Sequence, residues 1–167
     1  MIRFVKNQDY EGWKKLYLQY GEFYQVPMTH EGLSKVWNWI HDSSHEMEGL
    51  VYDKTSRIVG LAHFRRMPNP LRACDIGFLD DLFVDPAERG QLLGEALIEE
   101  LVKIAKSKGW PKIRWITADD NYRARTLYDR VAQKTMWNTY EIVVESDTDL
   151  FSGTDLSKRN CSSRTVD

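Results

Sequence analysis

The chain has 167 residues, of which 42% are hydrophobic and 29% charged, as expected of one globular domain with a single core. Its formal net charge of -2 at pH 7 creates no attractive field for polyanions, so nucleic acid is not expected as a direct substrate. No apolar run approaches the roughly 18 residues of a membrane span and no secretory leader opens the chain, so we expect a cytoplasmic protein without a membrane partner.

The N-terminal part of the chain predicts a short strand followed by two helices. Residues 2–5 form an apolar run, and residues 8–20 carry large apolar and aromatic side chains at helical spacing. Thr29 is placed to cap a second helix, whose apolar residues also recur with a helical period.

The middle of the chain predicts three strands, at residues 47–52, 58–66 and 75–84. The polar segment 53–56 predicts a hairpin turn between the first two strands. Pro68 and Pro70 predict a loop before the third strand.

The C-terminal part alternates helices and strands. Leucines recur along one face of a helix predicted to begin at Gly90 and to end at Gly109, with Pro111 beyond it. A buried strand is predicted at 113–117, a helix after the capping residues 119–121, and a last strand at 137–144.

This order predicts an α/β sandwich in which helices cover both faces of a mixed sheet. We expect one domain over residues 1–144 and a flexible tail over residues 145–167, which are rich in Ser, Thr and Asp. The two cysteines and four histidines show no metal-ligand spacing, so no metal site is expected.

The most informative segment is residues 80–97, where an apolar strand passes through a turn with two glycines into a helix. Unpaired N–H groups and the helix dipole make such a helix start an anion site, beside which Arg89 adds a cation. The spacing of Gly90 and Gly94 excludes the nucleotide motifs with Gly-Lys-Ser/Thr or G-x-G-x-x-G.

Residues 89–94, R-G-Q-L-L-G, resemble the acyl-CoA pyrophosphate loop of the GCN5-related N-acetyltransferase (GNAT) superfamily, with Leu92 in place of its middle glycine. Further segments resemble the fungal histone and polyamine acetyltransferases: R-F-V, E-G-W-K-K-L-Y, L-D-D-L-F-V-D and N-Y-R-A-R-T-L-Y-D-R-V-A. Residues 80–94 and 121–128 also resemble the spermidine/spermine N-acetyltransferases. The resemblance implies a largely antiparallel twisted sheet that holds acyl-CoA in a splay between central strands.

The resemblance also implies acetyl-CoA as the cofactor and a set of residues that bind it. These residues are Leu82, Phe83, Val84, Arg89, Gly90, Gln91, Leu92, Gly94, Glu95, Asn121, Arg123, Ala124 and Tyr128. Within this set, backbone N–H groups at Leu82 and Val84 are expected to polarise the thioester carbonyl. Asn121 is equally placed to be a plain helix cap.

Acetyl transfer to an ammonium group requires a base, for which Asp80 and Asp81 are the candidates. Because adjacent strand residues point to opposite faces, only one of them is expected to line the acceptor cleft, and likeness to the polyamine enzymes favours Asp80. Tyr128 matches the tyrosine that protonates the departing thiolate, although a core tyrosine would show the same spacing.

The acceptor side is expected to include Tyr20, Phe23 and Tyr24, whose aromatic rings suit a cationic amine, while the same spacing also fits a core helix. A polyamine, an amino acid, an aminoglycoside and a protein lysine all remain open as acceptors. The alternative is a non-catalytic acyl-CoA-binding sensor on the same fold. A homodimer paired through the apolar edge at residues 137–144 is expected.

Overall fold

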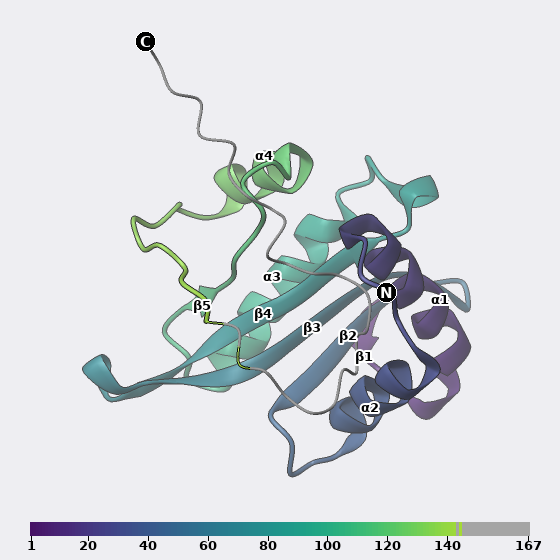
Figure 1. The fold of residues 1–167 in the computed structure, drawn as a ribbon, viewed down its shortest axis with the longest axis horizontal. Coiled ribbons are helices and arrows are strands. Elements are labelled where there is room, and N and C mark those ends of the chain that lie inside the picture. The colour runs from purple at the N-terminus through teal and green to yellow at the C-terminus, as the bar shows by residue number, and fades with distance from the viewer. Residues whose placement is uncertain (143, 145–167) are drawn as a thin grey trace.

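The computed structural model describes residues 1–142 and 144 and contains one five-stranded sheet in the order β1-β2-β3-β4-β5 (Figure 1). The strands are β1 (Ile2–Phe4), β2 (Met47–Lys54), β3 (Arg57–Asn69), β4 (Cys74–Val84) and β5 (Ile113–Arg114). Neighbouring strands are antiparallel except for β4 and β5, which are parallel. The predicted mixed, largely antiparallel α/β fold is confirmed.

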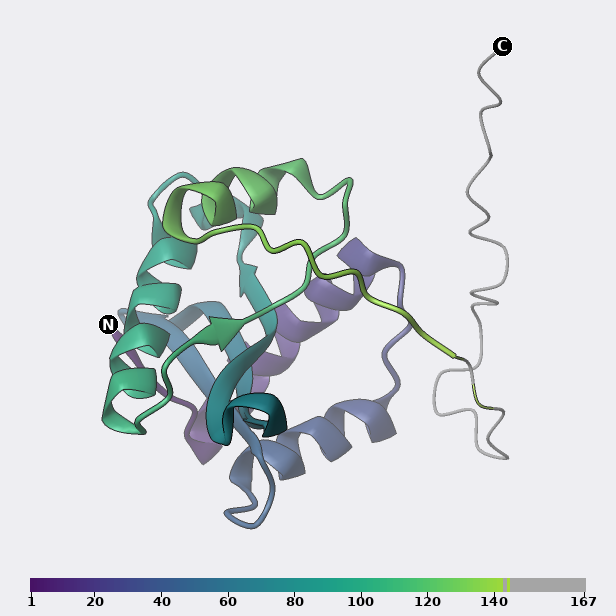
Figure 2. The same cartoon turned by 90° about the vertical axis from the view of Figure 1, so that its left-hand side faces the viewer.

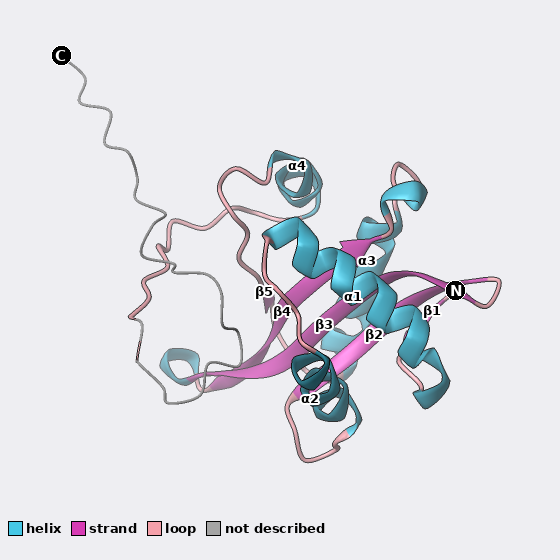
Figure 3. Cartoon of the chain, turned by 45° about the vertical axis from the view of Figure 1, so that its right-hand side comes forward, coloured by secondary structure: helices cyan, strands magenta, loops and turns pink. Residues whose placement is uncertain are grey.

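Helices cover both faces of the sheet (Figure 2). The helices α1 (Tyr10–Tyr24) and α2 (His30–His41) lie on one face, and α3 (Leu93–Ser107) lies on the other (Figure 3). The fourth helix, α4 (Tyr122–Val131), packs beside α3 at one end of the sheet. Three short 3-10 helices, η1 (Asn7–Asp9), η2 (Pro70–Arg72) and η3 (Pro86–Glu88), complete the described elements.

Two apolar clusters hold these layers together, one on each face. On the α3 face, fully buried Leu97 and Leu101 pack against Phe64 of the sheet. On the opposite face, Trp13 of α1 packs with Leu61, and both have no exposed surface. Burial of such side chains is the main favourable contribution to the folding free energy. No helix within the described residues has the length and apolarity needed to span a membrane.

A β-bulge interrupts the pairing of β3 with β4. His63 lies opposite Asp81 and Phe64 lies opposite Leu79, so Asp80 is an extra residue without a partner on β3. The expectation that Asp80 and Asp81 point to opposite faces was wrong, because a bulge breaks the strict alternation of a strand. Both carboxyl groups instead contact side chains of the α1-facing surface of β3.

Several predicted elements differ in extent from the structure, and β3 continues to Asn69, past Pro68 where a loop was expected. The helix α3 begins at Leu93 rather than at Gly90, because Gly90 and Leu92 have φ angles of 83° and 59°, outside the right-handed helical region. The predicted strand 113–117 shortens to the two residues of β5. The first helix, α1, extends to Tyr24 and thereby includes Phe23.

The predicted last strand at 137–144 was wrong for its described residues, 137–142 and 144, none of which is in a strand. A strand needs a hydrogen-bonding neighbour, and the two-residue β5 offers little edge to pair with. Trp137 and Ile142 are consequently 81% and 90% exposed. The predicted tail at 145–167 lies outside the described residues.

Candidate active site

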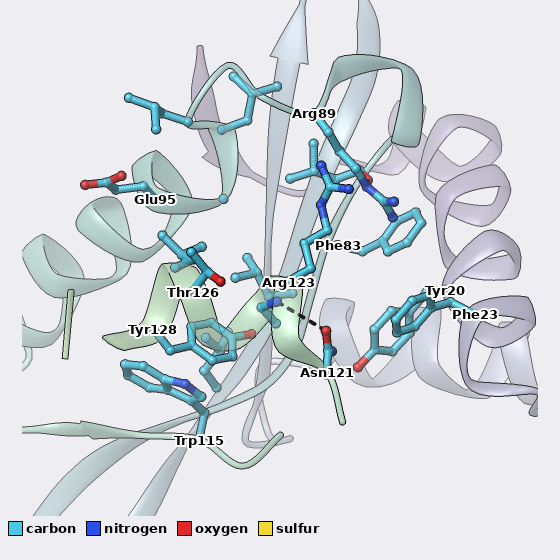
Figure 4. Close-up of a pocket in the computed structure, with 18 of the residues that line it drawn as sticks. Tyr20, Phe23, Phe83, Arg89, Glu95, Trp115, Asn121, Arg123, Thr126 and Tyr128 are labelled. Carbon is cyan, nitrogen blue, oxygen red and sulfur yellow. Dashed lines mark hydrogen bonds between the residues drawn. The ribbon is translucent and has the colours of Figure 1, made fainter. Parts of the chain in front are cut away.

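A cavity of about 420 Å³ lies where the ends of β4 and α1 meet the beginnings of α3 and α4 (Figure 4). Its size is in the range typical of small-molecule sites. Its lining contains every residue that we expected at the site except Gln91. The Gln91 side chain instead hydrogen bonds to Glu88 and Lys54, at 3.0 and 3.3 Å.

The N-terminus of α3 opens into this cavity, and no side chain of the described residues caps it. No backbone N–H of residues 90–95 donates a hydrogen bond to any residue that the structure describes. By contrast, Thr29 caps α2 and Asn121 caps α4. Unpaired N–H groups at the positive end of a 15-residue helix form an anion site.

Arg89 and Arg123 approach each other across the cavity (Figure 4). Burial, together with the repulsion from Arg123, lowers the pKa of Arg89, although a guanidinium stays protonated at physiological pH. Arg89 is held by a hydrogen bond from its Nε to the Val84 carbonyl, at 3.4 Å, and lies over the Phe83 ring. Two neighbouring cations that form no ion pair with the described residues favour a bound anion such as a phosphate.

The remaining arginines of α4 have other partners. Arg125 pairs with Asp119, and Arg130 pairs with Glu95. Of the four arginines considered at the sequence level, Arg89 and Arg123 are therefore the two whose charges face the cavity without an acidic partner among the described residues.

The edge of β4 beyond Phe78 faces the cavity because its pairing with β5 ends there. The Gly77 N–H donates toward the β5 side, to Lys112, whereas the Asp85 N–H donates toward β3, to Val59. Since N–H directions alternate along a strand and the bulge shifts that alternation by one residue, the Leu82 and Val84 N–H groups point away from β3 into the splay.

The sequence matches the model of the acetyltransferase (GNAT) family over residues 12–132. The chain belongs to the GNAT family. It is accordingly an acyltransferase of the N-acetyltransferase type, in agreement with the names of its relatives.

A relative of this GNAT protein is the D-amino-acid N-acetyltransferase HPA3 of Saccharomyces cerevisiae, 28% identical over 137 residues, covering 81% of this chain and 85% of the relative. The ribosomal-protein-alanine N-acetyltransferase of Brucella melitensis has a similar fold, with a TM-score of 0.72 at 22% identity over 86% of this chain and 98% of that one. An aminoglycoside N-acetyltransferase solved with CoA superposes with a TM-score of 0.67 at 15% identity, over 87% of this chain and 100% of that one.

In this GNAT protein, Asp81 is locked into a buried hydrogen-bond chain. The Trp13 indole donates to His63 Nε2 at 2.8 Å, so the neutral His63 ring carries its proton on Nδ1 and donates to Asp81 at 2.8 Å. Tyr17 donates to the same carboxyl at 3.2 Å. Burial alone would raise the pKa of Asp81, but hydrogen bonds from His63, Tyr20 and Tyr17 outweigh it and lower that pKa.

Asp80 has a different environment, although it is the next residue. Its carboxyl group lines the cavity, and its one side-chain partner among the described residues is Arg65, whose Nε lies 3.2 Å away. Burial raises the pKa of Asp80, and the negative charge of Asp81 adds to the rise, while Arg65 opposes it. Adjacent carboxyl groups whose pKa values move in opposite directions are typical of an acid–base site.

Tyr128 lies on the inner side of α4, with its ring packed edge-on against Trp115 at a centroid distance of 5.3 Å (Figure 4). Burial, with the neighbouring Tyr24 hydroxyl, raises the pKa of Tyr128 to about 12. Asn121 accepts from the Ala124 N–H at 3.2 Å and donates to the Tyr24 hydroxyl at 3.3 Å. Asn121 is thus the cap of α4 and also a link between α4 and α1.

Sequence reasoning did not identify Trp115 or His63 as part of the site. Trp115 follows the short β5 and resembles a core residue, and a lone histidine inside an apolar strand carries no signal of its hydrogen-bond partners. The long-range pairing of His63 with Asp81 became visible only through the register of β3 and β4.

Leu92 adopts a left-handed conformation, with φ 59° and ψ 19°, and is 63% exposed. This conformation costs a non-glycine residue roughly 1–2 kcal/mol, whereas glycine adopts it readily. We predict that Leu92→Gly raises the free energy of unfolding by up to about 1 kcal/mol, because relief of this strain exceeds the loss of a mostly exposed side chain.

Urea denaturation followed by circular dichroism measures this change. Leu92→Ala is the matched control, since alanine retains the left-handed strain and should show no comparable gain. A lower free energy of unfolding for Leu92→Gly than for Leu92→Ala would contradict the prediction.

Proposed function

We propose that the protein is an acetyl-CoA-dependent N-acetyltransferase in which a primary amine attacks the acetyl group directly, in a ternary complex. The observation that carries the proposal is that one cavity contains both an anion site and Asp80, a carboxyl group of raised pKa. The family membership supports acyl transfer, and the D-amino-acid substrate in the name of the yeast relative supports a small amine acceptor.

The α3 N-terminus, Arg89 and Arg123 are proposed to hold the phosphates of the cofactor. Within the part of the chain that the structure describes, the N–H groups of residues 90–95 and the two arginine charges have no partner, which fits this role. Acetyl-CoA supplies an acyl group activated as a thioester. The Leu82 and Val84 N–H groups are proposed to stabilise negative charge that develops on the carbonyl oxygen.

Asp80 is proposed as the base that takes the proton from the acceptor ammonium group. Asp81 is unsuited because three donors occupy its carboxyl group and its lowered pKa makes it a weaker base. The new bond joins the amine nitrogen to the acyl carbon as the carbon–sulfur bond breaks. The acylated nitrogen releases its second proton to solvent. Tyr128, protonated at every physiological pH, is proposed to give its proton to the departing thiolate and to recover one from solvent.

The alternative is an acyl-CoA sensor that binds its ligand and has no turnover. Leu92 is the feature that prompts it, because a leucine occupies the middle-glycine position of the loop. Thiol release from acetyl-CoA, measured with a panel of polyamines, amino acids, aminoglycosides and lysine peptides, separates the two. Binding of acetyl-CoA by calorimetry without thiol release on any amine would favour the sensor.

With an amine that is turned over, Asp80→Asn is expected to lower kcat/KM at pH 7 by roughly a hundredfold or more, while acetyl-CoA affinity is retained. Because the folded-state pKa of Asp80 is raised, its ionisation disfavours the fold as pH rises past the unfolded pKa of about 3.9. Asp80→Asn should therefore be at least as stable as the wild type at pH 7, and this difference should vanish at pH 3.

Thermal unfolding at the two pH values and the rate assay check both parts. Asp75→Asn, at a partly exposed carboxyl on the same strand, is the control and should keep full activity. Full activity of Asp80→Asn together with inactivity of a folded Asp81→Asn would reverse the assignment of the base.

Tyr128→Phe is expected to lower the single-turnover rate by roughly a hundredfold while leaving the melting temperature almost unchanged, because only the hydroxyl is lost. The acid limb of the pH–rate profile should stay in place, since a group with pKa of about 12 does not titrate there. Tyr140→Phe, at an 88% exposed tyrosine, is the control. A wild-type single-turnover rate for Tyr128→Phe would show that Tyr128 is a packing residue.

We also propose that the GNAT domain spans residues 1–144, with residues 145–167 as a polar extension, and that the domain forms a homodimer. The exposed apolar side chains of Met136, Trp137, Tyr140 and Ile142 are a surface that a second copy would cover.

Light scattering should give twice the chain mass for the wild type, and Ile142→Asp should shift the measured mass toward that of the monomer. Leu71→Asp, at a 91% exposed leucine between β3 and β4, should remain dimeric, and a monomeric wild type would contradict the proposal.

A further inference from the structure

Arg65 of β3 is the side-chain partner of the proposed base and lies next to Asp80, just outside the lining of the cavity. It follows His63 by two residues, so its side chain lies on the same face of β3, the face covered by α1 (Figure 3). Its guanidinium lies 4.8 Å from the centroid of the Phe78 ring, directly across the strand pair. Stacking on an aromatic ring holds a planar guanidinium in a defined orientation.

In the contact between Arg65 and Asp80, each side chain keeps hydrogen-bonding atoms that have no partner among the described residues. Arg65 Nε lies 3.2 Å from each carboxyl oxygen but is aligned for a hydrogen bond only with Oδ1. Asp80 Oδ2 is buried and accepts no hydrogen bond from the described residues. The terminal amino groups of Arg65 likewise donate to none of the described residues, although about a third of the side chain is exposed.

The neighbouring Arg66 shows what a structural arginine looks like in this strand. Its guanidinium donates to both Glu46 and Asp75, at distances between 2.7 and 3.1 Å. Arg65 uses one N–H where Arg66 uses three. The Arg65 donors and the Asp80 acceptor that have no partner in the described part of the chain are thus adjacent and of opposite charge.

A purely cationic amine is a poor match for this pair. The negative charge of Asp80 is already partly neutralised by Arg65, and the positive charge of the amine would be repelled by the Arg65 guanidinium. A zwitterion places one charge on each partner. Its ammonium group can donate hydrogen bonds to the Asp80 carboxylate, while its carboxylate accepts hydrogen bonds from the terminal amino groups of Arg65. Because Arg65 and Asp80 are in direct contact, the two substrate charges must be close together, as on a single carbon atom.

We propose that the acceptor is an α-amino acid, with Asp80 as the site of its ammonium group and Arg65 as the site of its carboxylate. This inference rests on the proposed acetyl transfer and narrows its acceptor class. An ε-amine of lysine carries its charge too far from the carboxylate to use both residues, and a polyamine has no carboxylate.

The test compares D- and L-phenylalanine with phenylalanine amide and phenethylamine, which keep the ring and amine but lack the carboxylate. The wild type should show a higher kcat/KM for at least one enantiomer of phenylalanine than for either analogue or for spermidine. In Arg65→Met, the ratio of kcat/KM for phenylalanine to that for phenethylamine should fall roughly ten- to hundredfold, mainly through KM, as expected for the loss of a charged hydrogen-bond pair. Arg65→Lys should restore part of this ratio, and Arg66→Met should leave it unchanged.

Two outcomes would overturn the proposal. One is a wild-type preference for phenethylamine or spermidine, and the other is an equal loss of both rates in Arg65→Met, which would make Arg65 a positioning residue for Asp80. If no amine is turned over, calorimetric titration of phenylalanine into the CoA-saturated protein still decides the question. Binding that is lost in Arg65→Met and kept in Arg66→Met supports the amino-acid site while refuting catalysis, and absence of binding refutes the site.

Discussion

The β-bulge at Asp80 is the constraint on which the rest of the site depends. One extra residue in β4 reverses the direction in which every later N–H group and side chain of the strand points. It turns the Leu82 and Val84 N–H groups toward the open side of the sheet, where β5 no longer pairs. It also brings two consecutive carboxyl groups near the same face of the sheet, which a regular strand does not allow.

Those two carboxyl groups have separate tasks because their neighbours differ. Asp81 faces His63 and two tyrosines, Tyr17 and Tyr20. Burial and the negative charge of Asp81 raise the pKa of both tyrosines, so their hydroxyl groups remain hydrogen-bond donors. Asp80 faces the cavity, and its buried Oδ2 oxygen has no hydrogen-bond donor among the residues described. The ionised Asp81 adds to the raised pKa of Asp80 through repulsion. The buried hydrogen bonds that link Trp13, His63 and Asp81 therefore influence the proposed base without a hydrogen bond to it.

The cofactor side of the cavity contains several locally unfavourable arrangements. Arg89 and Arg123 repel each other, no described side chain caps the α3 N-terminus, and Leu92 is in a left-handed conformation. Each costs stability by itself, and the apolar clusters on the two faces of the sheet keep them in place. A bound anion would relieve the first two, which is the physical reason for assigning this end of the cavity to phosphates.

The sequence by itself determined the order of the helices and strands through α4, the family and most of the cavity lining. Apolar periodicity depends on nearest neighbours along the chain, and the loop at 89–94 is contiguous, so both can be read locally. Only the tertiary structure decided how Asp80 and Asp81 face, why residues 137–142 form no strand, and that Gln91 turns away toward Glu88. It also revealed the partners His63 for Asp81 and Arg65 for Asp80, because strand register joins residues 15 to 18 positions apart whose contacts leave no periodic trace in the chain.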